Sequence, residues 1–274
     1  MFGAVEFYKK AKEKGIKPII GCEVYVAPRS RFQKNHALDS ERSHLILLCK
    51  NETGYKNLCK IVSHAFVEGF YYRPRIDHDL LKECSEGLVV LSACLQGELS
   101  RYIRDGLYEK ALETAKWYKS IFNDDYYIEV QDHNLPEQKR VNIELVKIAN
   151  ELDIKIVATN DAHYVEKTDA KMQKYLLLVG QNKNVDSKDA LTFETDEFYV
   201  KTEEEMLSLF PAEYINNTIE VANKCNYDFD FNHLKTAAGE GLQLHRRRQA
   251  QNMINLKSRQ TVGADGQRQV DQIL

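Results

Sequence analysis

The chain lacks the features that would place it in several common protein classes. Its six cysteines form no CxxC pair and follow no charged-then-apolar leader, so we expect reduced thiols in a cytoplasmic protein. No apolar run approaches the roughly 18 to 20 residues of a membrane-spanning helix. The net charge of −3 over 274 residues provides no basic excess, which argues against a protein whose main task is to grip phosphate backbones.

Apolar runs of strand length alternate with helical patterns along the first two thirds of the chain. Continuous apolar strands need helices over both faces, so this alternation predicts an α/β fold with largely parallel strands, either a barrel or a doubly wound sheet. Thr53 is the expected N-cap of the second helix, and Gly106 the expected break in the third. The expected strands lie within 16–28, 43–50, 86–94, 126–132 and 154–161, and the expected helices within 1–15, 53–66, 98–122 and 135–153.

The character of the sequence changes twice toward its C-terminal end. Beyond about residue 165 the pattern becomes mostly helical, and the last segment is rich in Gln and Arg without a clear period. We therefore expect an α/β region over residues 1–175, a helical continuation over 176–235 and an irregular, disordered tail over 236–274.

Several possible metal ligands follow the predicted strands. Asp161 and His163 alternate with Ala162 just past an apolar run, so both side chains point to one side if the extended geometry continues. Glu23, His44 and Cys94 also lie at the ends of apolar runs, and their side chains can all ligate a divalent metal. Because functional side chains gather at the carboxyl ends of strands in both architectures, we expect one rim to carry Glu23, Cys94, Asp132, His133, Asp161 and His163.

Each of these residues also has a purely structural interpretation. Asp161 could cap the next helix, His44 and His163 could be packed core residues, Glu23 a surface charge and Cys94 a small hydrophobe. The neighbouring pair in EVQDHN could equally begin a turn, so we leave it out of the ligand set. The stretch FYYRPRID could stack on nucleic-acid bases, but a structured loop with paired arginines is the favoured interpretation.

The strings MFGAVEFYKKAKEKGIKPIIGCEVYVAP, LSACLQGELSR, EVQDHN and VATNDAHY resemble the N-terminal PHP (polymerase and histidinol phosphatase) domain of bacterial DNA polymerase III alpha subunits, over roughly residues 1–234. The resemblance implies a distorted seven-stranded α/β barrel that binds divalent metals, zinc or manganese, and can act as a 3′–5′ exonuclease. It also implies DNA and other replicative polymerase subunits as partners of the parent protein. By this resemblance the metal-ligand positions are Glu23, His44, Cys94, Asp161 and His163.

The sequence departs from that family at both ends. A full domain of the family begins with strands carrying His-x-His and Thr-Asp-His-Gly, which would lie before Met1. In the family the polymerase palm follows the segment that corresponds to residues 1–234. We therefore expect an incomplete barrel lacking its first two strands, an incomplete metal site, no assignable catalytic residue and an inactive fragment of a replicative polymerase. Two alternatives stay open: a stand-alone phosphoesterase for a small phosphate ester, and a non-catalytic scaffold.

Overall fold

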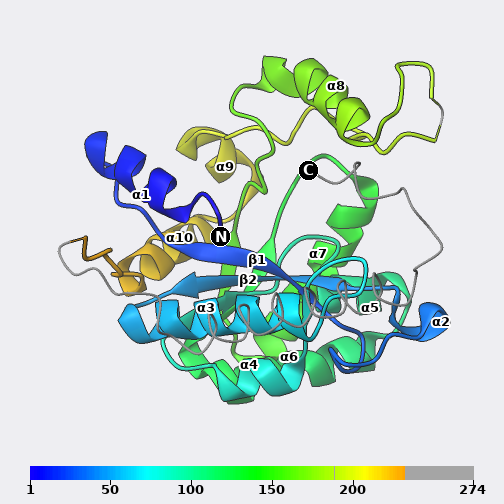
Figure 1. Cartoon of the computed structure of the whole chain (residues 1–274). Helices are drawn as coiled ribbons and strands as arrows, with labels where there is room; N and C mark the ends of the chain where they lie inside the picture. Colours follow the sequence, from blue (N-terminus) through cyan, green and yellow to red (C-terminus); the bar gives the residue numbers. More distant parts are fainter. Residues whose placement is uncertain (188, 232–274) are drawn as a thin grey trace, which may run out of the picture.

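The computed structural model describes residues 1–187 and 189–231, so the predicted tail lies outside the described residues (Figure 1). Its six-stranded sheet has the order β3-β1-β2-β4-β5-β6. The five predicted strands are confirmed, and a short sixth one, β3, occurs in the stretch expected to be irregular. The strands are β1 Gly21–Val26, β2 Ser43–Cys49, β3 Arg75–Ile76, β4 Leu88–Leu91, β5 Tyr126–Val130 and β6 Ile156–Ala158.

One strand of the sheet runs against its neighbours. The pairs β1–β3, β4–β5 and β5–β6 are parallel, whereas β2 is antiparallel to both β1 and β4. The chain returns from β1 to β2 through a loop that contains only the short helix α2, His36–Asp39, and adjacent strands joined without a crossover helix pair antiparallel. As a result, the first residues of β2 lie next to the carboxyl ends of the other strands.

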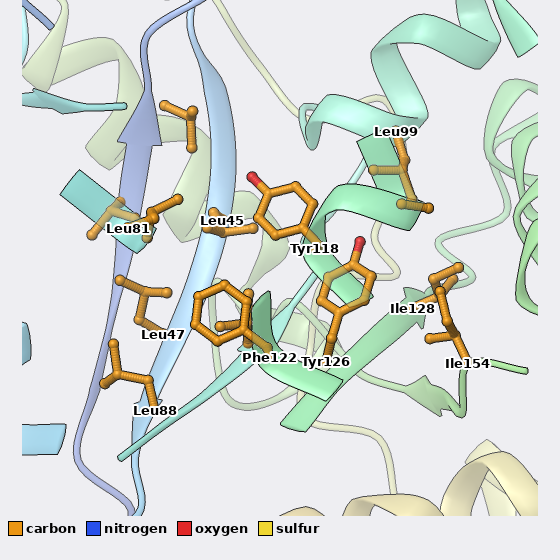
Figure 2. Close-up of a cluster of buried hydrophobic side chains, with 14 of the residues drawn as sticks. Leu45, Leu47, Leu81, Leu88, Leu99, Tyr118, Phe122, Tyr126, Ile128 and Ile154 are labelled. Carbon is orange, nitrogen blue, oxygen red and sulfur yellow. The ribbon is translucent and has the colours of Figure 1, made fainter. Parts of the chain in front are cut away.

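Five helices contribute most of the buried helical side chains in the main hydrophobic core, and three of them, α3, α4 and α6, lie together on one side of β1 and β2 in Figure 1. Leu45 and Leu47 from β2 meet Tyr118 and Phe122 from α6 in this core, as Figure 2 shows. The predicted break at Gly106 is confirmed, because this glycine has a φ of 75° between α5 and α6. These helices are α3 Glu52–Val67, α4 His78–Glu83, α5 Glu98–Arg104, α6 Tyr108–Phe122 and α7 Pro136–Leu152.

The start of α3 differs from the prediction. Asn51, not Thr53, is the N-cap, and its side-chain oxygen accepts a hydrogen bond of 3.0 Å from the amide of Gly54. Glu52 is already the first helical residue, so Thr53 lies inside the first turn. The cap is thus set by which side chain reaches the free amides of the first turn.

The opposite face of the sheet carries a smaller apolar cluster, to which Tyr127, Val157 and Val221 contribute. The helix α10, Ala212–Lys224, packs there against β6, and α1, Ala4–Glu13, lies on the same side (Figure 1). The first helix is confirmed, and Phe2, which precedes it, is 99% exposed.

The remaining elements are α8 Ala170–Gly180, α9 Glu203–Leu209 and two short 3-10 turns, Asn123–Asp125 and Lys167–Asp169. The predicted domain boundaries at residues 175 and 235 stay predictions. All six cysteines are free. No helix in the part of the chain that the structure describes has both the length and the apolar character to cross a membrane.

Candidate metal centre

Three of the predicted ligands come together at one end of the sheet. Glu23 from β1, His44 from β2 and Cys94 from the segment after β4 each offer one ligand atom, and these atoms lie within 4.8 Å of one another. The group includes a carboxylate, an imidazole and a thiol, which are the protein ligands that zinc binds. Residues separated by up to 71 positions in the chain therefore form one compact donor set.

Strand register brings Glu23 to His44. In the β1–β2 pair, Tyr25 lies opposite His44 and Glu23 lies opposite Ile46, so Glu23 and His44 are diagonal neighbours. Diagonal pairs on one face of an antiparallel sheet are within reach of long side chains. The Glu23 carboxylate accepts a hydrogen bond from Nδ1 of His44. Glu23 thus lies in the middle of its strand, whereas the sequence predicted that it lies at the strand end.

A tight turn brings Cys94 to the same place. Its Sγ lies 3.6 Å from Nδ1 of His44 and accepts a long hydrogen bond of 3.5 Å from the amide of Gln96. The carbonyl of Gln96 accepts a hydrogen bond of 2.9 Å from the amide of His44. The turn after β4 is therefore tied to the first residues of β2, which carry the second ligand.

The surroundings shift the pKa values of these groups in opposite directions. The hydrogen bond from His44 lowers the pKa of Glu23, and His163 lowers it further. Burial raises the pKa of the Cys94 thiol to about 12, and the nearby charge of Asp161 adds to this rise. A bound cation would reverse the second effect, because metal coordination favours the thiolate.

Asp161 and His163 lie near this group but differ from the prediction in detail. The strand β6 ends at Ala158, and Asp161 has a φ of 44°, so the extended geometry that would align the two side chains does not continue. Nδ1 of His163 donates a hydrogen bond of 2.8 Å to the carbonyl of Asp161. Burial raises the pKa of Asp161, the charge of Glu23 also raises it, and His163 opposes this rise. Their role as ligands stays a prediction.

The structural interpretation accounts for the other candidates. His133 is buried, its Nε2 lies 2.7 Å from the carbonyl of Asn160, and its ring stacks on Phe198. Asp132 accepts a hydrogen bond from the amide of Asn134, as expected for a turn. In FYYRPRID, Arg75 is fully buried, and it donates to backbone carbonyls and lies over the Tyr71 ring instead of pairing with an acid. These contacts are structural, which supports leaving them out of the site.

The sequence-based reasoning missed Glu129, a carboxylate next to the Cys94 turn. It lies in β5, where every residue is buried, and accepts a hydrogen bond of 3.1 Å from the amide of Ala93. Burial raises the pKa of Glu129, and Asp161 contributes to this rise. A lone acidic residue inside an otherwise apolar strand was the signal that could have identified it.

The chain has clear relatives among known proteins. Residues 1–133 match the family model described as the PHP domain. DNA polymerase III subunit alpha of Treponema pallidum is 47% identical over 230 residues, and that of Borreliella burgdorferi is 46% identical over 229 residues. The counterpart from Thermus aquaticus is 45% identical over 235 residues. These matches include 82%, 82% and 83% of this chain but only 20%, 20% and 19% of the relatives, so the chain spans about a fifth of their length.

Proposed function

The chain belongs to the DNA polymerase III alpha subunit family through its PHP domain, and we propose that it holds a divalent metal for phosphodiester hydrolysis in DNA replication. The observation that carries this proposal is the convergence of Glu23, His44 and Cys94 within 4.8 Å. We further propose that the chain alone is inactive or nearly so, because these three ligands form an incomplete centre, and that full activity depends on the remainder of the polymerase.

The donor set favours zinc over manganese. Thiolate and imidazole are ligands that zinc prefers, whereas manganese prefers carboxylates and water. Glu23 is the one carboxylate among the three converging groups. We propose Asp161 and His163 as additional ligands that complete the coordination after a local rearrangement, in support of which both already influence the charges of the three-residue group. Ligation by the Asp161 carboxylate would allow the site to bind manganese as well as zinc.

The chain's own residues suit an open site for an anionic substrate. A metal bound there would supply a Lewis acid and lower the pKa of a bound water. The Glu23 side chain is 46% exposed and that of His44 is 25% exposed, so a phosphodiester has access to this edge of the sheet. The same exposure limits activity, since bulk water screens the charges and the substrate is not enclosed.

A scaffold without catalytic function is the second candidate. One observation favours it: the imidazole of His44 is paired with the Glu23 carboxylate, and the burial of Cys94 raises its pKa and favours a neutral thiol, so the group does not require a cation to balance its charge. Under this alternative the chain contributes a folded surface to the polymerase and binds no metal.

Metal content of the purified chain tests the proposal. Protein prepared without chelators is expected to contain about one zinc per chain by elemental mass spectrometry, and Cys94→Ser is expected to lose most of it. Cys59→Ser is the matched control, because Cys59 is also partly exposed but lies in α3, outside the site. Hydrolysis of a single-stranded oligonucleotide and of a small phosphodiester is then measured with and without added zinc or manganese.

The outcomes separate the two candidates. Zinc that is retained by Cys59→Ser and lost by Cys94→Ser, together with slow metal-dependent hydrolysis, supports the proposed centre. If the wild type, Cys94→Ser and Cys59→Ser all contain negligible metal and have the same thermal stability, the metal centre is ruled out and the scaffold function is supported.

A further inference from the structure

Glu129 occupies an unusual position for a carboxylate. Its side chain is only 5% exposed, and it lies on the same face of β5 as Tyr127, which is the face that carries the proposed metal centre. Buried carboxylates are costly unless they are paired or hydrogen-bonded. The hydrogen-bond partners of Glu129 are neutral groups, so its burial is stabilised by the number and placement of these bonds.

The Glu129 carboxylate links the ends of three neighbouring strands. One oxygen accepts a hydrogen bond from the amide of Ala93, which follows β4, at 3.1 Å. The other accepts hydrogen bonds from Nε2 of Gln131 at 2.9 Å and from the hydroxyl of Thr159, which follows β6. The backbone amide of Glu129 in turn donates a hydrogen bond of 2.8 Å to the hydroxyl of Ser92. Glu129 therefore forms hydrogen bonds with both residues that precede Cys94, Ser92 and Ala93.

The segment that Glu129 holds is conformationally demanding. Ala93 has a φ of 65°, in the left-handed region that residues with a Cβ rarely adopt. A Cβ at Gly97 would lie 2.1 Å from the carbonyl oxygen of Ser92, so the turn closes tightly enough to require glycine there. Such a conformation persists only where the surrounding contacts hold it in place.

The same turn carries or contacts two of the three converging ligands. Cys94 follows Ala93 directly, and its carbonyl accepts a hydrogen bond of 2.8 Å from the amide of Gly97. The carbonyl of Gln96 accepts the hydrogen bond from the amide of His44. A displacement of Ala93 would therefore move the Cys94 thiol relative to the His44 imidazole.

We propose that Glu129 is a positioning residue of the metal centre, which fixes the turn through the Ala93 amide and so sets the Cys94 thiol against His44. The inference rests on the proposed metal-binding function. Glu129 itself contacts none of the three ligand atoms through a described hydrogen bond, and it acts on the cation only through the backbone.

Cobalt binding and hydrogen exchange together test this inference in the full chain. Co²⁺ stands in for zinc, and its absorption band from the bond to a thiolate reports whether Cys94 coordinates. Glu129→Ala is expected to weaken Co²⁺ binding about 10- to 100-fold and to reduce this band, in the range seen when partners of metal ligands are removed. Glu129→Gln keeps an oxygen that can accept from the Ala93 amide, so it is expected to restore most of both.

The matched control is Tyr127→Ala. Tyr127 is fully buried on the same strand and face, but its hydroxyl bonds Glu220 on α10, away from the Cys94 turn. This variant is expected to lower the melting temperature at least as much as Glu129→Ala and to leave the Co²⁺ affinity and spectrum unchanged. Equal loss of Co²⁺ binding in Tyr127→Ala and Glu129→Ala would show a general loss of stability and overturn the positioning role.

A metal-free measurement keeps the inference testable if the wild-type chain binds no Co²⁺. Amide hydrogen exchange of a peptide containing residues 92–97, measured in chelator, is expected to be about tenfold faster in Glu129→Ala than in the wild type or Tyr127→Ala. Failure of Co²⁺ to bind the wild type would contradict the proposed metal centre alone. Unchanged exchange in Glu129→Ala would contradict the positioning role, whether or not metal binds.

Discussion

The helices α3 and α8 have similar apolar character but very different surroundings. In α3, Leu58 and Ile61 are fully buried between the sheet and its neighbours. In α8, Leu178 is the buried residue, whereas Leu176 and Val179 are 63% and 77% exposed. Apolar periodicity therefore predicts a helix but not its burial, because burial depends on which other elements reach that face.

The comparison extends to the regions around these helices. Residues 16–158 form the sheet and most of its main core, to which the buried Met206 also contributes, while contacts such as that of Phe198 with His133 join residues 193–200 to the sheet region. Local stability should follow the number of buried apolar contacts.

The largest effect is expected for Leu47→Ala. Leu47 is fully buried in the middle of β2, so its truncation leaves a cavity between the sheet and α6. The free energy of unfolding is expected to fall by about 3 to 5 kcal/mol. Urea denaturation followed by circular dichroism measures it, and a loss below about 1 kcal/mol would mean that this core is loosely packed.

A smaller effect is expected for Phe198→Ala. The Phe198 ring stacks on His133 with centroids 4.0 Å apart and contacts Phe193 at 4.4 Å, which attaches residues 193–200 to the end of β5. The expected loss is about 2 kcal/mol, below the usual range for a buried Phe, because a segment at the edge can relax. Limited proteolysis should then cut within residues 159–211 before the sheet region. Simultaneous cleavage of both regions would contradict their independence.

Glu220 connects α10 to the sheet region electrostatically. Its carboxylate accepts hydrogen bonds from Lys155 at 2.5 Å and from the hydroxyl of Tyr127 at 2.7 Å, and these lower the pKa of Glu220 to about 2. A lowered folded-state pKa gives stability above the ordinary value of 4.5 that is lost as the pH falls toward about 2. Glu220→Gln should therefore show a shallower loss of stability over this interval. The measurement is the urea midpoint of the wild type and of Glu220→Gln at several pH values. Parallel pH dependences of the two midpoints would contradict the prediction.

The smallest effect is expected for Leu176→Ser in α8. The side chain is mostly exposed, so the free energy of unfolding should change by less than about 0.5 kcal/mol. Leu58→Ser in α3 is the matched substitution and should be strongly destabilising, since Leu58 is fully buried. Similar losses in the two variants, again by urea denaturation, would show that α8 is covered in solution.

Much of the element order could be predicted from the sequence, because apolar runs and glycine positions act locally. The break at Gly106 is one example. The reversal of β2 could not be predicted, since an apolar run such as SHLILLC carries no direction relative to its neighbours.

The candidate site shows the same division. Glu23, His44 and Cys94 were identified by type and by their place beside strands, and the structure brings them together. Their exact placement depends on the β1–β2 register and on the left-handed conformation of Ala93, which are set by long-range contacts. The left-handed Asp161 overturned the expected alignment with His163 for the same reason.

The buried guanidinium of Arg75 has a consequence for how the loop between β1 and β2 can vary. It donates hydrogen bonds to the carbonyls of Gln33, Asp39 and Gly69, which are groups that every residue type offers. At Gln33 the path of the loop is therefore held through the backbone, whereas the side chains of Arg31 and Asp39 also hold the loop through their bonds to Asp77 and Arg29. Related chains can exchange the side chain at Gln33, and alter what the loop presents to a partner, while its course stays the same as long as Arg75, Arg31 and Asp39 are kept.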